Sequence, residues 1–600
     1  MDHSHAAVPS TPPWFLRPGT MEILACVVTA LVYLGALAFG FVYDDVLQIF
    51  QSPALHSWRY LPQYFTSDVL AALHPGAGGN YYRPLLLLWL RLNYVLFGQE
   101  PAGWHATTVL CHLLATYLVF RVVEQVAGDR MVAFTAALLF GVHPAHIESV
   151  AWISGVSDPL MSCFLLGSLL AFFAWRRSAK VATAVCSLVL FGFALLSKET
   201  AAVLPLLIFA AVLVESQPPG VSQPALRRFG LAIRESAPYV LVALFYLFVR
   251  SRALHGFSHP AISLSWARMF LTWPAVLWFY ARHLLLPTGL SEFYSLNYQD
   301  HATGSGFWLP LALLTILLLA SWFSIRALFH GSAAQSSAAQ RSTAWFAVAL
   351  IVLSLLPVLD LPSLTVGDIV HDRYLDLPSV GYVLLIALSL REIERRLPSF
   401  RTISFSLASA GLVALGFAAL AVTQQTQWAN DIQLYTRGLE SAPDNLTVRD
   451  NLANALLAAN QPQRAIPMYL EVLQRSPGFW RSNYNLGLAY YKTGNSAGAE
   501  DYLERAIKID RGDSDEFIYL AVVELQRKKF PEAAENARQA IARNPQARGY
   551  HFILGLIREA QGDRNAAIAA FMTEANEHPE NTAAITELQK IEGAPASPQP

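Results

Sequence analysis

Acidic and basic side chains gather where long apolar segments of this sequence end. The stretch FVYDDVLQIF at 41–50 places Asp44 and Asp45 directly after an apolar run. A carboxylate in such a place can act as a general base that takes the proton from an attacking hydroxyl group. Ionisable groups close to a bilayer are costly and therefore indicate function. We predict that Asp44 and Asp45 are catalytic.

Three later stretches carry further ionisable residues at segment ends: HPAHIESVAWISGVSDPL (143–160), SKET (197–200) and GDIVHDRYLDLPS (367–379). If the four stretches meet, acids for proton abstraction lie beside cations that can hold an anionic leaving group such as a phosphate. Arginine matches phosphate with a fork of N–H donors. We predict Arg373, Lys198 and Arg83 as phosphate-binding residues. The predicted walls of the site are His143, His146, Glu148, Asp158, Glu199 and Asp372.

Some of these groups also have simpler interpretations. Asp44 and Asp45 can be a pair that ends a helix in the membrane interface. Lys198 can extend along apolar surface toward the membrane boundary without binding anything. Asp372 and Arg373 can form a structural ion pair. The sequence alone leaves these alternatives open.

A metal site is the other interpretation that the spacing allows. His143, His146 and Glu148 are spaced as metal ligands can be, but no further ligand pattern supports an ion. Asp158 precedes Pro159 and fits a plain helix N-cap as well as a site residue. We expect no metal site and no required cofactor.

Apolar segments of bilayer-spanning length must position these groups. Only 14% of the residues are charged, against roughly 25% in soluble proteins. Up to residue 423, apolar runs of roughly 17–25 residues recur. We predict a cytoplasmic segment at 1–20 and a polytopic helix bundle over 21–423. The candidate segments are 21–43, 105–123, 131–150, 158–175, 181–197, 200–215, 237–254, 266–287, 306–328, 343–360, 375–391 and 402–423.

The distribution of Lys and Arg predicts the orientation of this bundle. Basic loops face the cytoplasm, which places the first large loop, 44–104, on the opposite side. Segment 266–287 is interrupted by charged residues and a proline, so we expect a re-entrant or in-plane helix there. About 11 transmembrane helices then remain. The apolar stretch at 81–98 is either an interfacial helix or a short buried one.

The C-terminal part of the chain repeats with a period of 34 residues. A helix–turn–helix period of this length, with small residues where the helices cross, indicates tetratricopeptide (TPR) repeats. We predict a TPR α-solenoid over 424–592, made of a half-repeat and four repeats, and a disordered tail at 593–600. The recurring sets are Ala453, Gly487, Ala521 and Gly555; Ala465, Ala499, Ala533 and Ala567; and Tyr469, Leu503, Ala537 and Phe571.

The motifs occur together and in order in a known family. FVYDDVLQI, YYRPLLLLWLRLNYVLFG with PAGWH, HPAHIESVAWISGVSDPL, LSKET and DRYLDLPSVGY resemble the transmembrane and TPR-containing O-mannosyltransferases. These proteins are polytopic glycosyltransferases of the GT-C class, and the resemblance covers 20–580. It implies a GT-C-type bundle and a donor sugar on a polyprenyl phosphate. It also implies an acidic pair in the first outer loop that serves the acceptor.

The sequence thus predicts an integral-membrane glycosyltransferase. It would move a sugar, mannose by resemblance, from a polyprenyl-phosphate donor to hydroxyl groups of extracytoplasmic protein acceptors that the TPR domain binds. We expect a multi-pass protein among lipids of the cell or inner membrane, or of the endoplasmic reticulum in a eukaryote. The TPR domain should be extracytoplasmic. The net charge of −1 gives no electrostatic reason to expect nucleic-acid binding.

Two other functions fit parts of the sequence. A non-catalytic, membrane-anchored TPR scaffold for envelope assembly explains the repeats, but it does not explain acids and cations confined to one side. A secondary transporter places its polar groups at the bilayer midplane, whereas here they lie at the ends of segments.

Overall fold

The computed structural model describes residues 19–73, 79–215, 224–256, 263–329, 335–364, 368–397, 404–510 and 514–593. Every regular element in these ranges is a helix, which confirms the predicted all-α fold. The chain divides into two compact units, Met1–Pro443 and Asp444–Pro600. The predicted cytoplasmic segment 1–20 and the predicted tail 593–600 lie outside the described residues, except for residues 19, 20 and 593.

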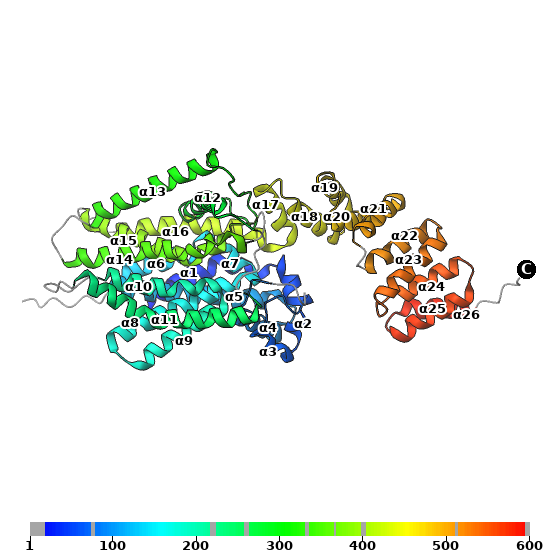
Figure 1. Cartoon of the computed structure of the whole chain (residues 1–600), viewed down its shortest axis with the longest axis horizontal. Coiled ribbons are helices and arrows are strands. Elements are labelled where there is room, and N and C mark those ends of the chain that lie inside the picture. The colour runs from blue at the N-terminus through cyan, green and yellow to red at the C-terminus, as the bar shows by residue number, and fades with distance from the viewer. Residues whose placement is uncertain are drawn as a thin grey trace, which may run out of the picture. The chain divides into compact units, whose positions relative to one another are not determined.

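The first unit is a bundle of apolar helices that run alongside one another (Figure 1). Within the described ranges, eight helical segments are long and apolar enough to cross a membrane, or nine if one bent pair counts as a span. The predicted number of 11 crossings remains a prediction. The helices at the predicted segments are α1 (Thr20–Tyr33), α5 (Pro101–Ala127), α6 (Arg130–Gly141), α8 (Ser157–Ser178), α9 (Val181–Ser197), α10 (Leu204–Val214), α11 (Ala225–Ala253), α13 (Ser305–Phe329), α14 (Gln335–Ser354), α15 (Asp376–Arg396) and α16 (Phe405–Gln424).

Helix α12 (Trp266–Leu285) differs in direction from the helices around it. Figure 1 shows it nearly end-on, while α14, α15 and α16 are seen along their length. The helix contains Pro274 and ends with Arg282 and His283, and it is not among the eight candidate spans of the described ranges. Its proposed re-entrant or in-plane position remains a prediction.

The predicted segment 131–150 is broken rather than continuous. Helix α6 ends at Gly141, a tight turn follows over Pro144–His146, and α7 (Ile147–Ala151) leaves at an angle of 51°. Pro144 suits the first position of the new turn because its missing N–H and fixed φ cost nothing there. The bend turns α7 away from the direction of α6.

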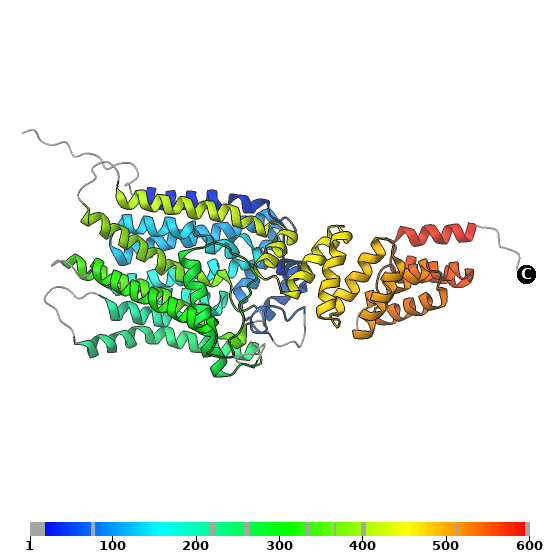
Figure 2. The same cartoon turned by 90° about the horizontal axis from the view of Figure 1, so that it is seen from above.

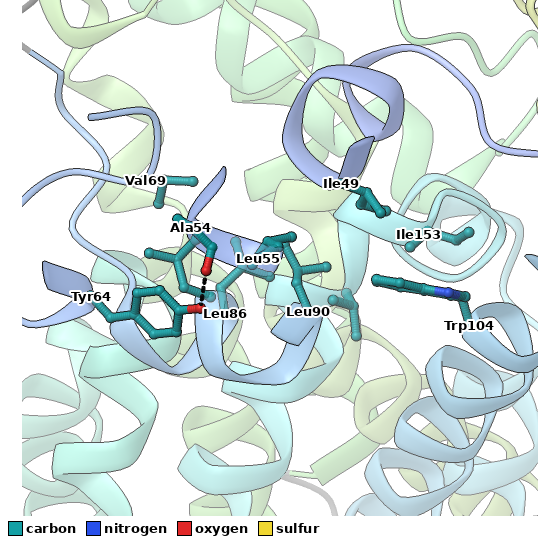
Figure 3. Close-up of a cluster of buried hydrophobic side chains, with 11 residues drawn as sticks. Ile49, Ala54, Leu55, Tyr64, Val69, Leu86, Leu90, Trp104 and Ile153 are labelled. Carbon is teal, nitrogen blue, oxygen red and sulfur yellow. Dashed lines mark hydrogen bonds between the residues drawn. The ribbon is translucent and has the colours of Figure 1, made fainter. Parts of the chain in front are cut away.

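The first loop folds into short helices on an apolar cluster (Figure 3). These helices are α2 (Pro53–His56), α3 (Leu61–Tyr64) and α4 (Pro84–Phe97), and the Tyr64 hydroxyl donates a 2.7 Å hydrogen bond to the Ala54 carbonyl. Helix α4 buries Leu86 and Leu90 in this cluster and exposes Val95 and Leu96. The buried face agrees with a short core helix, and an interfacial position for the stretch 81–98 remains a prediction.

The second unit consists of antiparallel helix pairs (Figure 2). Ala453 and Ala521 are fully buried, and an added Cβ at Gly487 would lie 2.7 Å from Leu503 Cγ. The small residues of the repeat are thus required where paired helices cross, as the 34-residue period predicts. The pairs are α18 (Leu446–Ala458) with α19 (Pro462–Arg475), α20 (Trp480–Lys492) with α21 (Ser496–Ile509), α22 (Ser514–Gln526) with α23 (Phe530–Arg543) and α24 (Tyr550–Ala560) with α25 (Arg564–Glu577), followed by α26 (Thr582–Gly593).

The segment predicted as a TPR half-repeat packs in the first unit. Residues Gln425–Ala429 form a turn, and α17 (Asp431–Ser441) follows it. The Gly40 amide donates to the Ala429 carbonyl at 3.2 Å, and the Gln425 side chain donates to the Val32 carbonyl at 2.8 Å. The contacts therefore place the boundary between the units after Pro443, whereas the predicted TPR domain begins at residue 424.

Candidate active site

The two acids after the first helix face different surroundings. Tyr43 before them has a positive φ of 56°, which is rare for a bulky residue, and a π-helical turn over Val46–Gln51 follows. Asp44 lines a cavity, whereas Asp45 is fully buried and does not line it. The sequence predicted that both acids are catalytic, with Asp44 slightly favoured. The two residues are neighbours on one helical turn, where successive side chains point about 100° apart, so they face different surroundings.

Asp45 is held inside the protein by hydrogen bonds. It accepts bonds from the backbone amide of Ser154 at 3.0 Å, from the Ser154 hydroxyl at 2.6 Å and from the amide of Val42 at 3.1 Å. These bonds tie the first loop to the stretch after α7. Asp45 therefore links the first loop to the stretch that contains Ser154, and both segments line the cavity. Of the two acids, only Asp44 is open to the cavity.

The cavity brings together three of the four predicted stretches. It has a volume of about 100 Å³. Asp44 and Arg83 come from the first loop, Trp152 and Ser154 from the turn between α7 and α8, and Ser157 from the first residue of α8. Arg373 comes from the turn Asp372–Leu375 before α15. The remaining lining residues are Gln48, Val69, Leu70, Tyr81, Leu86 and Tyr374. Val69 and Leu86 also belong to the apolar cluster of Figure 3, which therefore supports the floor of the cavity.

Arg83 enters the cavity from the residue that precedes α4. Its Nε and Nη2 atoms donate to the two oxygens of Glu199 at 3.0 and 2.6 Å, and its guanidinium lies 4.6 Å from the centre of the Tyr81 ring. Within the described ranges, Nη1 has no hydrogen bond. A bidentate pair of this kind fixes the plane of the guanidinium, so the Nη1 edge of Arg83 is open to a further acceptor.

Arg373 enters the cavity from the opposite wall. Its Nη1 atom contacts Glu148 and lies 3.2 Å from Glu292, and its backbone amide donates to Glu148 at 3.1 Å. The guanidinium lies 5.5 Å from the centre of the Trp152 ring. Among the described residues, none accepts a hydrogen bond from its Nε or Nη2 atom. Arg373 and Arg83 thus both offer N–H groups to the cavity that Asp44 lines.

Lys198, the third predicted cation, does not line this cavity. Its ammonium group lies 2.6 Å from each oxygen of Asp158, and both residues are buried. The same group lies 4.7 Å from the centre of the Tyr374 ring, whose other contacts include the Arg373 guanidinium at 5.7 Å. Two buried opposite charges with this geometry form a structural pair behind the wall of the cavity.

The predicted wall residues His143, His146 and Asp372 point into the protein. His143 bonds the Leu284 carbonyl at 3.1 Å, and His146 bonds the Ser379 hydroxyl at 3.0 Å. Asp372 lies 2.8 Å from His283 of α12. These three residues brace the ends of α6, α12 and α15 against one another. His143 and His146 therefore do not converge with Glu148 on a shared ion.

Sequence reasoning did not select Glu292, Asp368 or His371. Glu292 is a buried acid in the loop after α12, where no periodic pattern marks it, and it contacts Arg373. His371 and Asp368 lie in the predicted stretch 367–379, two and five residues before Arg373. Their position in this stretch, close to Arg373, is the sequence signal that could have identified His371 and Asp368. Glu292 could be recognised only once the chain had folded.

Burial changes the acidity of the carboxyl groups around the cavity. It raises the pKa of Asp44 above the usual range, although the nearby Arg373 opposes this, and it raises the pKa of Asp45 to about 7. Burial and the neighbouring Glu148 raise the pKa of Glu292 well above its ordinary value. Perturbed acids in a cavity are typical of functional sites.

Known proteins resemble the chain over both units. Residues 82–226 match the dolichyl-phosphate-mannose-protein mannosyltransferase family, and residues 451–514 and 520–581 match the tetratricopeptide repeat. Protein O-mannosyl-transferase Tmtc1 of Drosophila melanogaster is 37% identical over 185 residues, 30% of this chain and 21% of its own length. Protein O-mannosyl-transferase TMTC1 of Homo sapiens is 27% identical over 524 residues, 79% of this chain and 57% of its own length.

A further human relative, protein O-mannosyl-transferase TMTC3, is 25% identical over 584 residues, 88% of this chain and 60% of its own length. The chain is therefore similar to proteins named protein O-mannosyl-transferases over most of its length. The resemblance inferred from the motifs is thus confirmed over most of the sequence. The chain spans 57% and 60% of the lengths of the two human O-mannosyl-transferases.

The region shared with the mannosyltransferase family contains only part of the site. Arg83, Glu148, Asp158, Lys198 and Glu199 lie within the matched residues 82–226. Asp44, Asp45, Glu292 and Arg373 lie outside it. The cavity is therefore completed by segments from both sides of the matched region.

Proposed function

We propose that the chain is an integral-membrane protein O-mannosyltransferase that uses a polyprenyl-phosphate mannose donor. The observation that carries this proposal is that Asp44, Arg83 and Arg373 line one cavity. The names of the relatives support the mannosyl group and the protein acceptor. The description of the family that matches residues 82–226 supports a lipid-phosphate donor.

The geometry supports a single displacement at the anomeric carbon of the sugar. Asp44 takes the proton from a Ser or Thr hydroxyl group of the acceptor. At the same time the oxygen of that hydroxyl group forms a bond to the anomeric carbon. The bond from the carbon to the phosphate oxygen breaks, and its electron pair leaves with the lipid phosphate. Because no enzyme nucleophile takes part, the configuration at the anomeric carbon inverts.

The two arginines stabilise the departing phosphate. Negative charge grows on the bridging oxygen as the bond breaks, and preformed donors aimed at this position lower the barrier. Arg373 and Arg83 keep N–H groups available for it, and Glu148 and Glu199 fix their orientation. The buried pair of Lys198 and Asp158 keeps the wall behind Tyr374 in place.

We further propose that the TPR unit binds the acceptor protein. The segment that leads into it, 425–441, packs beside the Asp44 loop, so we place the array on the same, extracytoplasmic side of the membrane as the cavity. Holding an extended acceptor there would raise its local concentration at the site. Reporters fused after residue 592, one active only in the cytoplasm and one only outside, test this side directly.

Mannose transfer by the purified full chain is the deciding experiment. The protein is reconstituted in liposomes with polyprenyl-phosphate mannose and a Ser/Thr-rich acceptor, and glycopeptides are detected by mass spectrometry. We expect a hexose on hydroxyl residues with wild type and none with Asp44→Asn. A non-catalytic scaffold predicts no hexose with either protein, and a product that retains the donor configuration contradicts the single displacement.

A further inference from the structure

Three side chains beside the cavity converge on one point. Glu148 of α7, Glu292 of the loop after α12 and His371 before α15 are all buried. Their ligand atoms lie within 4.8 Å of one another. Nδ1 of His371 lies 3.5 Å from Glu292 Oε1 and 4.0 Å from Glu148 Oε1. Three segments far apart in the sequence thus bring one imidazole nitrogen and two carboxylates together.

Two polar atoms of this cluster lack a hydrogen bond in the part of the chain that the structure describes. Nδ1 of His371 and Oε2 of Glu292 are buried without a hydrogen bond among the described residues. His371 is only 4% exposed and Glu292 only 1%. Buried polar groups are nearly always hydrogen-bonded, so each exception needs an explanation. Arg373 contacts both carboxylates, yet it leaves these two atoms unsatisfied.

The charge balance leaves room for an additional cation. Glu148 and Glu292 contact Arg373, and Asp44 shares the cavity with it. Asp368 Oδ2 lies 3.6 Å from His371 on the far side of its ring. The Arg373 guanidinium therefore lies near four carboxyl groups. Buried carboxylates of this number require protons or a further positive ion.

We infer that Glu148, Glu292 and His371 form a binding site for a divalent transition-metal ion. Ligand atoms about 2.1 Å from a metal ion lie about 3.4 Å apart in tetrahedral geometry and about 3.0 Å apart at adjacent octahedral positions. The observed 3.5 and 4.0 Å need only a small contraction. One imidazole and two carboxylates suit Mn²⁺ or Zn²⁺ better than Mg²⁺ or Ca²⁺.

The position of Asp368 agrees with this assignment. A histidine that binds a metal through one ring nitrogen usually turns its other N–H toward a carboxylate, which fixes the ring. Asp368 lies on that side of His371, next to Nε2. The ion would add positive charge beside Arg373, where the phosphate leaves. This role rests on the proposed function, whereas the site itself does not.

Metal binding to the full chain tests the inference without reference to mannose transfer. The protein is purified in detergent with a tag that lacks histidine, stripped with EDTA and titrated with Mn²⁺, and free Mn²⁺ is measured by electron paramagnetic resonance. We expect one bound equivalent, displaced by Zn²⁺. In pulsed electron paramagnetic resonance spectra of the Mn²⁺-loaded wild type, we also expect modulation from an imidazole nitrogen. This measurement uses only the wild-type protein, so it does not depend on whether a variant folds.

Matched variants locate the site. Glu292→Gln and His371→Ala should weaken Mn²⁺ binding by at least about tenfold. Glu235→Gln makes the same chemical change at a buried acid that pairs with Arg176 in another part of the unit, and it should bind like the wild type. Arg373→Ala removes a competing cation and should still bind Mn²⁺. No binding at millimolar Mn²⁺, or Mn²⁺ binding by Glu292→Gln and His371→Ala as tight as that of the wild type, overturns the inference.

The metal site and the mannosyltransferase can fail separately. Transfer that continues at full rate in EDTA-treated protein that binds no Mn²⁺ would overturn the metal site and leave the enzyme. One bound Mn²⁺ with an imidazole signal, in a protein that transfers no mannose, would leave the metal site and overturn the proposed function.

Discussion

The backbone amide of Tyr43 donates a 2.9 Å hydrogen bond to the carboxylate of Asp431, 388 positions later in the chain. The bond joins the residue before Asp44 to the first residue of α17. The Tyr43 ring contacts Phe293 and Tyr435, and Trp152 stacks on Trp428 with ring centres 5.6 Å apart. The segment after α16 therefore holds the loop that carries Asp44.

These contacts support a strained backbone. A tyrosine with φ of 56° is unfavourable and persists only where its surroundings enforce it. We therefore expect Asp431→Ala to lower the turnover number for mannose transfer by about 10-fold to 100-fold, because Asp44 is displaced. The KM for the lipid donor should stay unchanged. Asp431→Asn keeps an oxygen that can accept the bond and should remain near wild type; equal losses in both variants would contradict this role.

Asp44→Asn tests the base. The amide cannot accept the acceptor's proton, so transfer should fall by at least about 100-fold, while the thermal unfolding midpoint stays close to that of wild type. Asp300→Asn, at an exposed acid paired with Arg268, is the control and should retain activity. Near-normal turnover in Asp44→Asn on a confirmed acceptor would remove this residue from the mechanism.

Asp45 should affect stability with a defined pH dependence. Burial raises its pKa in the folded protein to about 7, whereas the ordinary value is 3.8. Between these pH values the folded chain keeps a proton that the unfolded chain has lost, so this contribution to stability falls as the pH rises and is constant above pH 7. The difference in unfolding midpoint between wild type and Asp45→Asn should therefore shrink from pH 4 to pH 7. A difference that does not change with pH would argue against the buried proton.

Arg373 should act on the donor rather than on the acceptor. Arg373→Ala should raise the KM for polyprenyl-phosphate mannose and lower turnover by about 100-fold or more, with little change in the KM for the acceptor peptide. Arg373→Lys should restore only part of the activity, because a point charge cannot bridge Glu148, Glu292 and a phosphate together. Steady-state kinetics with each substrate varied in turn gives the answer, and unaltered donor kinetics would remove Arg373 from the phosphate site.

The repeat unit should matter only for large acceptors. A chain that ends at Pro443 keeps the whole first unit as the contacts define it. We expect it to mannosylate short Ser/Thr peptides at close to the wild-type rate and to lose most transfer to protein acceptors, because the gain in local concentration disappears. Competition by the isolated residues 444–600 on the full chain is the complementary measurement. Equal rates on proteins with and without the array would contradict acceptor binding.

The sequence by itself determined the architecture. The length of an apolar segment indicates whether it can span a bilayer, and a 34-residue period indicates where paired helices cross. Neither property depends on contacts with distant parts of the chain. Gly487 and Ala453 were therefore recognisable from spacing alone. The stretches that contribute Asp44, Arg83 and Arg373 could also be selected from the sequence. A charged residue beside a membrane-spanning segment is costly whatever the tertiary fold, so its presence indicates a function.

Only the tertiary structure decided what each of these residues faces. Asp44 and Asp45 are neighbours on one helical turn, and the packing around them leaves Asp44 at the cavity while Ser154 holds Asp45 inside the protein. Lys198 was predicted to bind phosphate ahead of Arg83, but Lys198 is buried against Asp158, whereas Arg83 lines the cavity. Glu292 carried no local pattern at all. Which partner a side chain meets depends on contacts between segments hundreds of residues apart, and the spacing of residues along the chain does not record those contacts.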